Sequence, residues 1–152
     1  MNIIFIDIDG VLNSPNYFLS RNRQSFPFSE DRSDDIDPVP CKLLNDFCLN
    51  HDVKLVLSST WRHDHNEQKI MSVFKKRGLD VEVVAVTPII YKQRGDEINM
   101  FLETTTLKID KYAILDDDGD FYPEQPLVQT HWETGLTQTH IKKLEKIFVP
   151  VG

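Results

Sequence analysis

Short apolar runs that end in polar residues recur along the chain, and this feature constrains the fold more than any other. Residues 3–8, 53–57, 81–86 and 112–115 form four such runs, and residues 127–128 form a weaker fifth candidate. A continuous apolar run of this length is typical of a strand that is buried on both faces of a parallel sheet. We therefore expect a mostly parallel sheet.

Between these runs, apolar residues recur at the spacing of helices that pack one face on a core. The stripes lie at residues 43–48, 70–74, 98–102 and 141–148, and Thr137 stands before the last one as a candidate N-cap. Strands and helices therefore alternate. This order predicts an α/β fold, a Rossmann-like three-layer sandwich with a mostly parallel sheet.

One segment, residues 14–40, breaks the alternation. The whole chain of 152 residues suits one domain, expected over residues 1–152, but this segment is long for a connection inside it. It is rich in Ser, Asn, Arg and Pro, and five acidic residues gather near its end: Glu30, Asp31, Asp34, Asp35 and Asp37. Two interpretations stay open, a solvated and partly mobile insertion or a flap over a site beside the first strand.

The charge balance excludes some classes of function. Lys and Arg number 17 against 24 Asp and Glu, a net charge of −7, which argues against broad binding of duplex nucleic acid. There is no apolar run long enough to span a membrane, and the first residues lack the flanks of a signal peptide. Cys41 and Cys48 are expected to be reduced core residues, so we expect a cytoplasmic protein.

Polar residues close the apolar runs, and the carboxyl ends of parallel strands meet at one edge of a sheet. The candidate site residues at this edge are Asp7, Asp9, Ser58, Ser59, Thr60, Asp116, Asp117, Asp118 and Asp120, with Arg94 and Lys92 opening the third helix nearby. Gathered carboxylates repel one another, and burial worsens the repulsion. Because no His or Cys cluster joins these oxygen ligands, the expected counter-ion is Mg²⁺.

These residue types suit phosphoryl transfer. One carboxylate can attack phosphorus once its charge is balanced, and a second carboxylate two residues later can move the proton. The hydroxyl and N–H groups of Ser58 and Ser59 suit the oxygens of a phosphate. Phosphoryl transfer needs mainly positioning and neutralisation of charge, and this set of residues supplies both.

Four motifs in this order resemble the haloacid dehalogenase-like (HAD) phosphatases. Residues 7–12 (DIDGVL) look like the first motif, and Ser58 after an apolar strand is similar to the second. Arg94 resembles the Lys or Arg of the third motif, and residues 114–117 (ILDD) look like the fourth. Residues 58–62 and 127–137 give a looser similarity to small HAD domains associated with RNA-repair proteins. The resemblance implies a HAD-like fold with a short insertion instead of a full cap domain.

The resemblance also implies catalytic roles. Asp7 would be the nucleophile that forms an aspartyl-phosphate, and Asp9 would act as general acid and then as general base. Ser58 would bind the phosphoryl oxygens with help from the Ser59 amide. Arg94 would stabilise the nucleophile and the phosphate, although Lys92 could take this place.

The same resemblance implies a metal site. Mg²⁺ would be held by Asp7, by the backbone carbonyl of Asp9 and by Asp116, with Asp117 in support. Asp120 could be the further acid that family members often carry after the fourth motif.

Several other residues leave alternatives open. Arg62 could lie on the surface beside a packed Trp61, or it could contact a second phosphate of the substrate. His131 and Trp132 could line the mouth of the pocket. The arginines of the 14–40 segment could contact a phosphorylated substrate; they are Arg21, Arg23 and Arg32.

The sequence thus predicts a Mg²⁺-dependent phosphatase that hydrolyses a phosphomonoester through Asp7. Without a large cap the site would be open, so the expected substrate is a nucleotide or a nucleic-acid terminus. Two rival classes are a non-catalytic HAD-fold binding module and a phosphoacceptor signalling domain. The sequence does not predict the oligomeric state.

Overall fold

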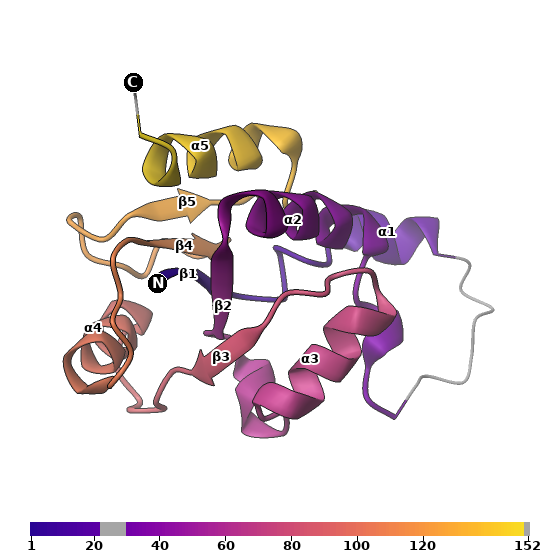
Figure 1. Cartoon of the computed structure of the whole chain (residues 1–152). Helices are drawn as coiled ribbons and strands as arrows, with labels where there is room; N and C mark the ends of the chain where they lie inside the picture. Colours follow the sequence, from indigo (N-terminus) through magenta and orange to yellow (C-terminus); the bar gives the residue numbers. More distant parts are fainter. Residues whose placement is uncertain (22–29, 151–152) are drawn as a thin grey trace.

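The computed structural model describes residues 1–21 and 30–150, and Figure 1 shows their arrangement. Five strands form one sheet: β1 (Asn2–Ile6), β2 (Val53–Leu57), β3 (Val83–Val86), β4 (Tyr112–Asp116) and β5 (Leu127–Gln129). Five α-helices accompany them: α1 (Pro15–Ser20), α2 (Pro38–His51), α3 (Glu67–Lys76), α4 (Arg94–Thr104) and α5 (Gln138–Phe148). Two short 3₁₀ helices are η1 (Ser33–Asp35) and η2 (Thr60–His63).

The sheet is parallel throughout, with strand order β3-β2-β1-β4-β5. The chain starts on the central strand β1 and builds outward through β2 and β3. It then returns to the other side of β1 and builds β4 and β5. The expected α/β fold with a parallel sheet is therefore confirmed.

Alternate residues of β1 face opposite sides of the sheet. Ile4 and Ile6 pack in a large core with side chains of α2, α3 and α5, whereas Ile3 and Phe5 pack with α4. All four side chains are fully buried. This burial on both faces explains why the strand has no polar alternation, and it fixes the register that sets the positions of the residues after β1.

The helices begin where the sequence offers caps. Thr137 caps α5 in a reciprocal pair with His140, as the sequence predicts. Asp37 caps α2 through the N–H of Val39, and Pro38 is the first residue of that helix, where its fixed φ is favourable. The segment expected to be irregular over residues 14–40 therefore ends at Asp37, because its last three residues start α2.

Both described ends of this segment are anchored on the body of the protein. The hydroxyl of Tyr17 in α1 donates to the carbonyl of Asp34 at 3.0 Å, and Arg77 donates to Tyr17 Oη at 3.0 Å. Arg77 also donates to the carbonyl of Ile36, which is fully buried. The described parts are thus docked rather than detached, and α1 brings side chains to the pocket described below.

Charged residues of the segment pair with one another and with α3. Asp31 pairs with Lys76, and Asp35 lies near both Arg21 and Arg32, at 3.6 and 3.4 Å. Arg23, the third arginine considered as a substrate contact, lies outside the described residues. The acidic group therefore serves local packing and does not extend the acidic cluster at the sheet edge.

Cys41 and Cys48 are free thiols buried on α2, where burial raises the pKa of each thiol to about 12. Both act as small apolar side chains of the core. In the described part of the chain, no helix has the length and apolar character needed to cross a membrane.

Candidate active site

The site lies where the chain switches direction across the sheet. β1 and β4 are neighbours, but the connections that leave them run to opposite sides, and in such sheets ligands bind beyond the carboxyl ends of these strands. Asp7 follows β1 directly, and Asp116 is the last residue of β4. The N–H of Asp7 donates to the carbonyl of Leu115 at 3.0 Å, so the ladder continues up to the site.

Three carboxyl groups form an acidic floor, made of Asp7, Asp116 and Asp117. One carboxylate oxygen from each lies within 4.8 Å of the others. Asp7 and Asp116 are buried, and Asp117 is half-buried. Loss of hydration raises the pKa of both Asp7 and Asp116, and the nearby Asp7 charge raises that of Asp116 further. Such a cluster calls for a cation to balance it, and its ligands are the oxygens that Mg²⁺ prefers.

Arg94 supplies one positive charge to the floor. Its Nη1 lies 3.6 Å from Oδ1 of Asp7 and 3.1 Å from Oδ2 of Asp116, and it donates to the carbonyl of Ser58 at 2.5 Å. Burial lowers the pKa of Arg94, but Asp7 and Asp116 more than offset this and raise it overall. The guanidinium therefore stays charged. It lies between Asp7, the nucleophile candidate, and Ser58 in the loop after β2.

The hydrogen bonds at the start of α4 explain why Arg94, and not Lys92, reaches the site. The N–H of Arg94 donates to Oδ2 of Asp120 at 3.2 Å, and the N–H of Gly95 donates to the Asp120 carbonyl. Asp120, considered as a further acid of the site, thus holds the first turn of α4. Lys92 lies on the exposed loop before this helix.

The loop after β2 carries the candidate phosphate ligands. The hydroxyl of Ser58 is buried and has no hydrogen-bond partner among the described residues. A buried polar atom without a partner costs stability unless a ligand satisfies it, which fits a role in binding a phosphate oxygen. Ser59 is buried as well, and its hydroxyl caps η2 through the N–H of Trp61. Its side chain is therefore structural.

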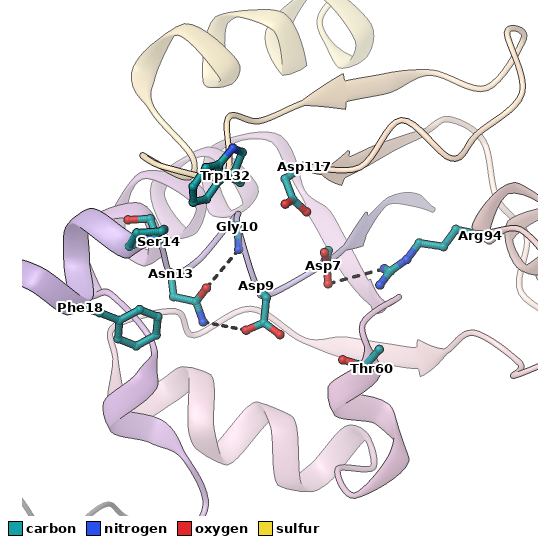
Figure 2. A pocket seen from close by; sticks show the side chains of 11 residues that line it. Asp7, Asp9, Gly10, Asn13, Ser14, Phe18, Thr60, Arg94, Asp117 and Trp132 are labelled. Carbon is teal, nitrogen blue, oxygen red and sulfur yellow. Dashed lines mark hydrogen bonds and ion pairs between the residues drawn. The ribbon is translucent and has the colours of Figure 1, made fainter.

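Asp9 occupies a different environment from Asp7, although only two residues separate them. Its carboxylate is exposed at the pocket, where it accepts a hydrogen bond from Nδ2 of Asn13 at 2.9 Å (Figure 2). The indole N–H of Trp61 lies 3.3 Å from both carboxylate oxygens of Asp9. Among the described residues, the acidic floor forms without the Asp9 carboxylate. This carboxylate is therefore oriented by neutral donors rather than by Arg94.

The turn between the two aspartates depends on Gly10. Its φ is +82°, and a Cβ atom there would stand 2.4 Å from Oδ2 of Asp117. The N–H of Gly10 donates to Oδ1 of Asn13, and its carbonyl accepts from the hydroxyl of Thr130 at 2.7 Å. The glycine thus lets the backbone pass directly beside the acidic floor.

Arg62 is buried, which corrects both sequence interpretations of it, the surface arginine and the phosphate contact. It forms a 2.7 Å ion pair with Glu97 of α4, and the two side chains are only 5% and 7% exposed. Arg62 also donates to the carbonyl of Ser59 at 2.9 Å, and Glu97 accepts from the N–H of Ile90. The sequence signal was weak because the partner lies 35 residues away on another helix. The ion pair links the loop after β2, which carries Ser58 and Ser59, to α4, which carries Arg94.

Comparison with known families agrees with this geometry. Residues 3–141 match the model of the HAD domain in Swiss Army Knife RNA repair proteins. The chain belongs to this family. Both the suspected HAD resemblance and the looser similarity to RNA-repair HAD domains are therefore confirmed. No curated protein and no solved structure matches the chain. HAD domains are phosphatase-type hydrolases that generally use Mg²⁺, so the family supports the chemistry that the floor suggests.

The HAD domain has a pocket of about 440 Å³ above the acidic floor, and part of its wall was not predicted from the sequence. Five of the sequence candidates line it: Asp7, Asp9, Thr60, Arg94 and Asp117. The further lining residues come from the turn after β1, from α1 and from the β5–α5 loop, and they include Asn13, Phe18 and Trp132 (Figure 2). Of the two residues considered for the mouth, Trp132 lines it, and His131 stacks on Trp132.

Proposed function

We propose that this HAD domain is a Mg²⁺-dependent phosphatase that hydrolyses a phosphomonoester through an aspartyl-phosphate on Asp7. One observation carries the proposal. Asp7 and Asp116 lie buried together at the switch point of the sheet, with the Arg94 guanidinium against both of them. A purely structural role would not favour two buried carboxyl groups with raised pKa values in contact.

The first half-reaction transfers the phosphoryl group to the protein. A carboxylate oxygen of Asp7 attacks phosphorus while the bond from phosphorus to the leaving oxygen breaks. Asp9 in its protonated form gives its proton to that oxygen, so the product alcohol leaves neutral. Arg94 and the free hydroxyl of Ser58 stabilise the phosphoryl oxygens.

The second half-reaction restores the protein. Asp9, now ionised, takes a proton from a water molecule whose oxygen attacks the phosphorus. The bond between phosphorus and the Asp7 oxygen breaks, and inorganic phosphate leaves. The exposure of Asp9 suits this role, because its carboxylate must meet both the leaving group and water, whereas the burial of Asp7 keeps the acyl phosphate from other water.

The donors present fit Mg²⁺. Asp7 and Asp116 would hold it with the backbone carbonyl of Asp9, and Asp117 would support it or ligate directly, since its carboxylate belongs to the acidic floor. Bound Mg²⁺ neutralises charge on the floor and on the phosphate. Arg94 alone carries one positive charge, which is too little to balance three carboxylates and a phosphate.

The substrate proposed is a nucleotide or a nucleic-acid terminus. The segment between Asn13 and α2 is short for a cap domain, and the pocket of about 440 Å³ has room for more than a phosphate group. The matching family is described from RNA repair proteins, which supports a nucleic-acid end. The net charge of −7 argues against broad duplex binding but not against gripping one phosphorylated end.

A substrate screen tests this function. The chain would be assayed with and without Mg²⁺ on nucleotides, 3′-phosphorylated oligonucleotides, sugar phosphates and an aryl phosphate. We expect hydrolysis that needs Mg²⁺, that disappears in Asp7→Asn and that persists in Asp46→Asn, an exposed control on α2. Absence of any hydrolysis by the unchanged chain would favour a binding module. A long-lived aspartyl-phosphate would favour a signalling domain, and preference for small sugar phosphates would contradict the substrate class.

A further inference from the structure

Two aromatic side chains stand at the mouth of the pocket and form an aromatic rim, made of Phe18 and Trp132. Phe18 comes from α1 and is 38% exposed, and Trp132 comes from the β5–α5 loop and is 54% exposed. Both line the same pocket as Asp7 and Arg94 (Figure 2). Exposed aromatic surface that borders a polar site is typical of ligand binding, because water covers such rings poorly.

The rim is held in place before any ligand arrives. The ring of Trp132 stacks on that of His131, with centroids 6.3 Å apart and planes 19° from parallel. The N–H of Gly135 donates to the carbonyl of His131 at 2.7 Å, which closes the loop that carries Trp132. This loop is in turn fixed to the turn after β1, because the N–H of Leu136 donates to the carbonyl of Val11.

A backbone hydrogen bond also joins the two sides of the rim. The N–H of Asn16, two residues before Phe18, donates to the carbonyl of Glu133, the residue after Trp132, at 3.3 Å. Two chain segments more than 100 residues apart thus meet beside the pocket. The fold therefore fixes the backbone that carries the two rings, which lowers the entropy cost of binding a ligand at the rim.

The cation of the pocket lining lies at the floor. Among the described lining residues Arg94 is the sole cation, and it lies against Asp7 and Asp116. The guanidinium of Arg21, which is not a lining residue, lies 5.3 Å from the centre of the Phe18 ring, so the ring of Trp132 is the one without a cation over it among the described contacts. The ligand that fits has one phosphate group at the floor and a flat, weakly polar group at the mouth. A nucleobase has this character, since each base presents a π-face, whereas a sugar phosphate offers hydroxyl groups that two aromatic rings cannot satisfy.

We propose that the aromatic rim binds the nucleobase next to the scissile phosphate by stacking, chiefly on Trp132, and so selects nucleotide ends over other phosphomonoesters. This inference rests on the proposed phosphatase activity and specifies how its substrate is chosen. The base is held by its face rather than by its edge. The site therefore tolerates different bases and discriminates against substrates that have none.

The experiment compares substrates within each variant. For the unchanged chain and for Trp132→Ala, kcat/KM is measured on nucleoside monophosphates, glycerol phosphate and O-phosphotyrosine. We expect the ratio of nucleotide to glycerol phosphate to fall roughly 10-fold in Trp132→Ala, the scale of one lost stack, and about 3-fold in Phe18→Ala. Trp132→Phe should recover most of the ratio. Leu19→Ala, an exposed control on α1, should keep it.

Other outcomes overturn the inference. If the ratio of nucleotide to glycerol phosphate kcat/KM is unchanged in Trp132→Ala, the rim does not bind the base. A preference for O-phosphotyrosine points to a peptide substrate instead. Fluorescence titration with an unphosphorylated nucleoside separates this failure from failure of the phosphatase function. Trp132 is exposed and the second tryptophan, Trp61, is buried, so quenching that is lost in Trp132→Phe reports base binding without turnover. Absence of quenching contradicts the rim proposal even if hydrolysis is observed.

Discussion

The acidic floor and the aromatic rim belong to one pocket but are built in opposite ways. The floor is buried and charged, and it stands on the ends of adjacent parallel strands. The rim is exposed and uncharged, and it stands on a short helix and a loop that follow the strands. Under the proposed function, the residues at the strand ends would carry out the reaction, and the residues of the connections would select the substrate.

The two aspartates of the first motif also differ in their surroundings. Asp7 faces Arg94 and two other carboxyl groups in a buried setting, whereas Asp9 meets neutral donors from Asn13 and Trp61 at the solvent side. Environments this different are what the proposed roles need, with Asp7 as nucleophile and Asp9 as proton carrier. Four predictions test the site, from the largest expected effect to the smallest.

The largest effect is expected when Asp7, the proposed nucleophile of the floor, is replaced. Asp7→Asn keeps the shape of the side chain but cannot form an acyl phosphate, so we expect kcat/KM to fall on the order of 10³-fold or more on every phosphomonoester. Steady-state kinetics on an aryl phosphate and on a nucleotide measures it. Equal losses on both substrates are essential, because a loss confined to one of them would assign Asp7 to substrate choice.

The second largest effect is expected at the buried ion pair between Arg62 and Glu97. Glu97→Gln leaves Arg62 charged and buried without its partner, which should destabilise the fold by about 3 kcal/mol. Urea denaturation with an unchanged m-value measures the loss. Asp46→Asn breaks the exposed pair with Lys42 and should cost less than about 1 kcal/mol. Similar costs for the two variants would show that burial does not distinguish the pairs.

The third effect is a dependence on pH that originates in the floor. Asp116 has a raised pKa in the folded state, so the stability it contributes is present below about pH 4 and is lost as the pH rises through its folded pKa. In EDTA, Asp116→Asn should therefore gain stability over the unchanged chain between pH 5 and pH 8, by roughly 4–8 °C in Tm for about 2 kcal/mol.

Mg²⁺ provides the control for that measurement. Binding to the folded state should raise the Tm of the unchanged chain, more at pH 8 than at pH 5, and Asp116→Asn should lose most of this increase. Thermal melts in the two buffers are sufficient. A Tm that responds to Mg²⁺ equally in both proteins would place the cation elsewhere.

The smallest effect is expected at the solvent side, where Trp61 orients Asp9. Trp61→Phe keeps the packed ring but removes the N–H that reaches the carboxylate. We expect kcat/KM to fall about 10-fold on an alkyl phosphate, whose leaving group needs a proton, and less than about 3-fold on p-nitrophenyl phosphate. Asp9→Asn should show the same pattern more strongly. A uniform loss on both substrates would indicate a packing defect.

The sheet and the group of polar residues at its edge could be predicted because buried parallel strands leave apolar runs, and the residues that close those runs must converge. Asp7 and Asp116 were found in this way. Phe18 was not found in this way, because its position depends on the docking of α1, and no residue of this helix is buried. The sequence of such a helix has no apolar periodicity that would predict it. Its place is decided by single contacts, such as that between Tyr17 and Asp34.

Gly10 determines how closely the backbone approaches the Asp117 carboxylate. The backbone at this residue passes so close to Asp117 that the one side chain compatible with the turn is a hydrogen atom. A methyl group there would push on a carboxylate of the floor without adding or removing any charge. Gly10→Ala would therefore displace the Asp117 carboxylate while the number of charged side chains in the site stays the same.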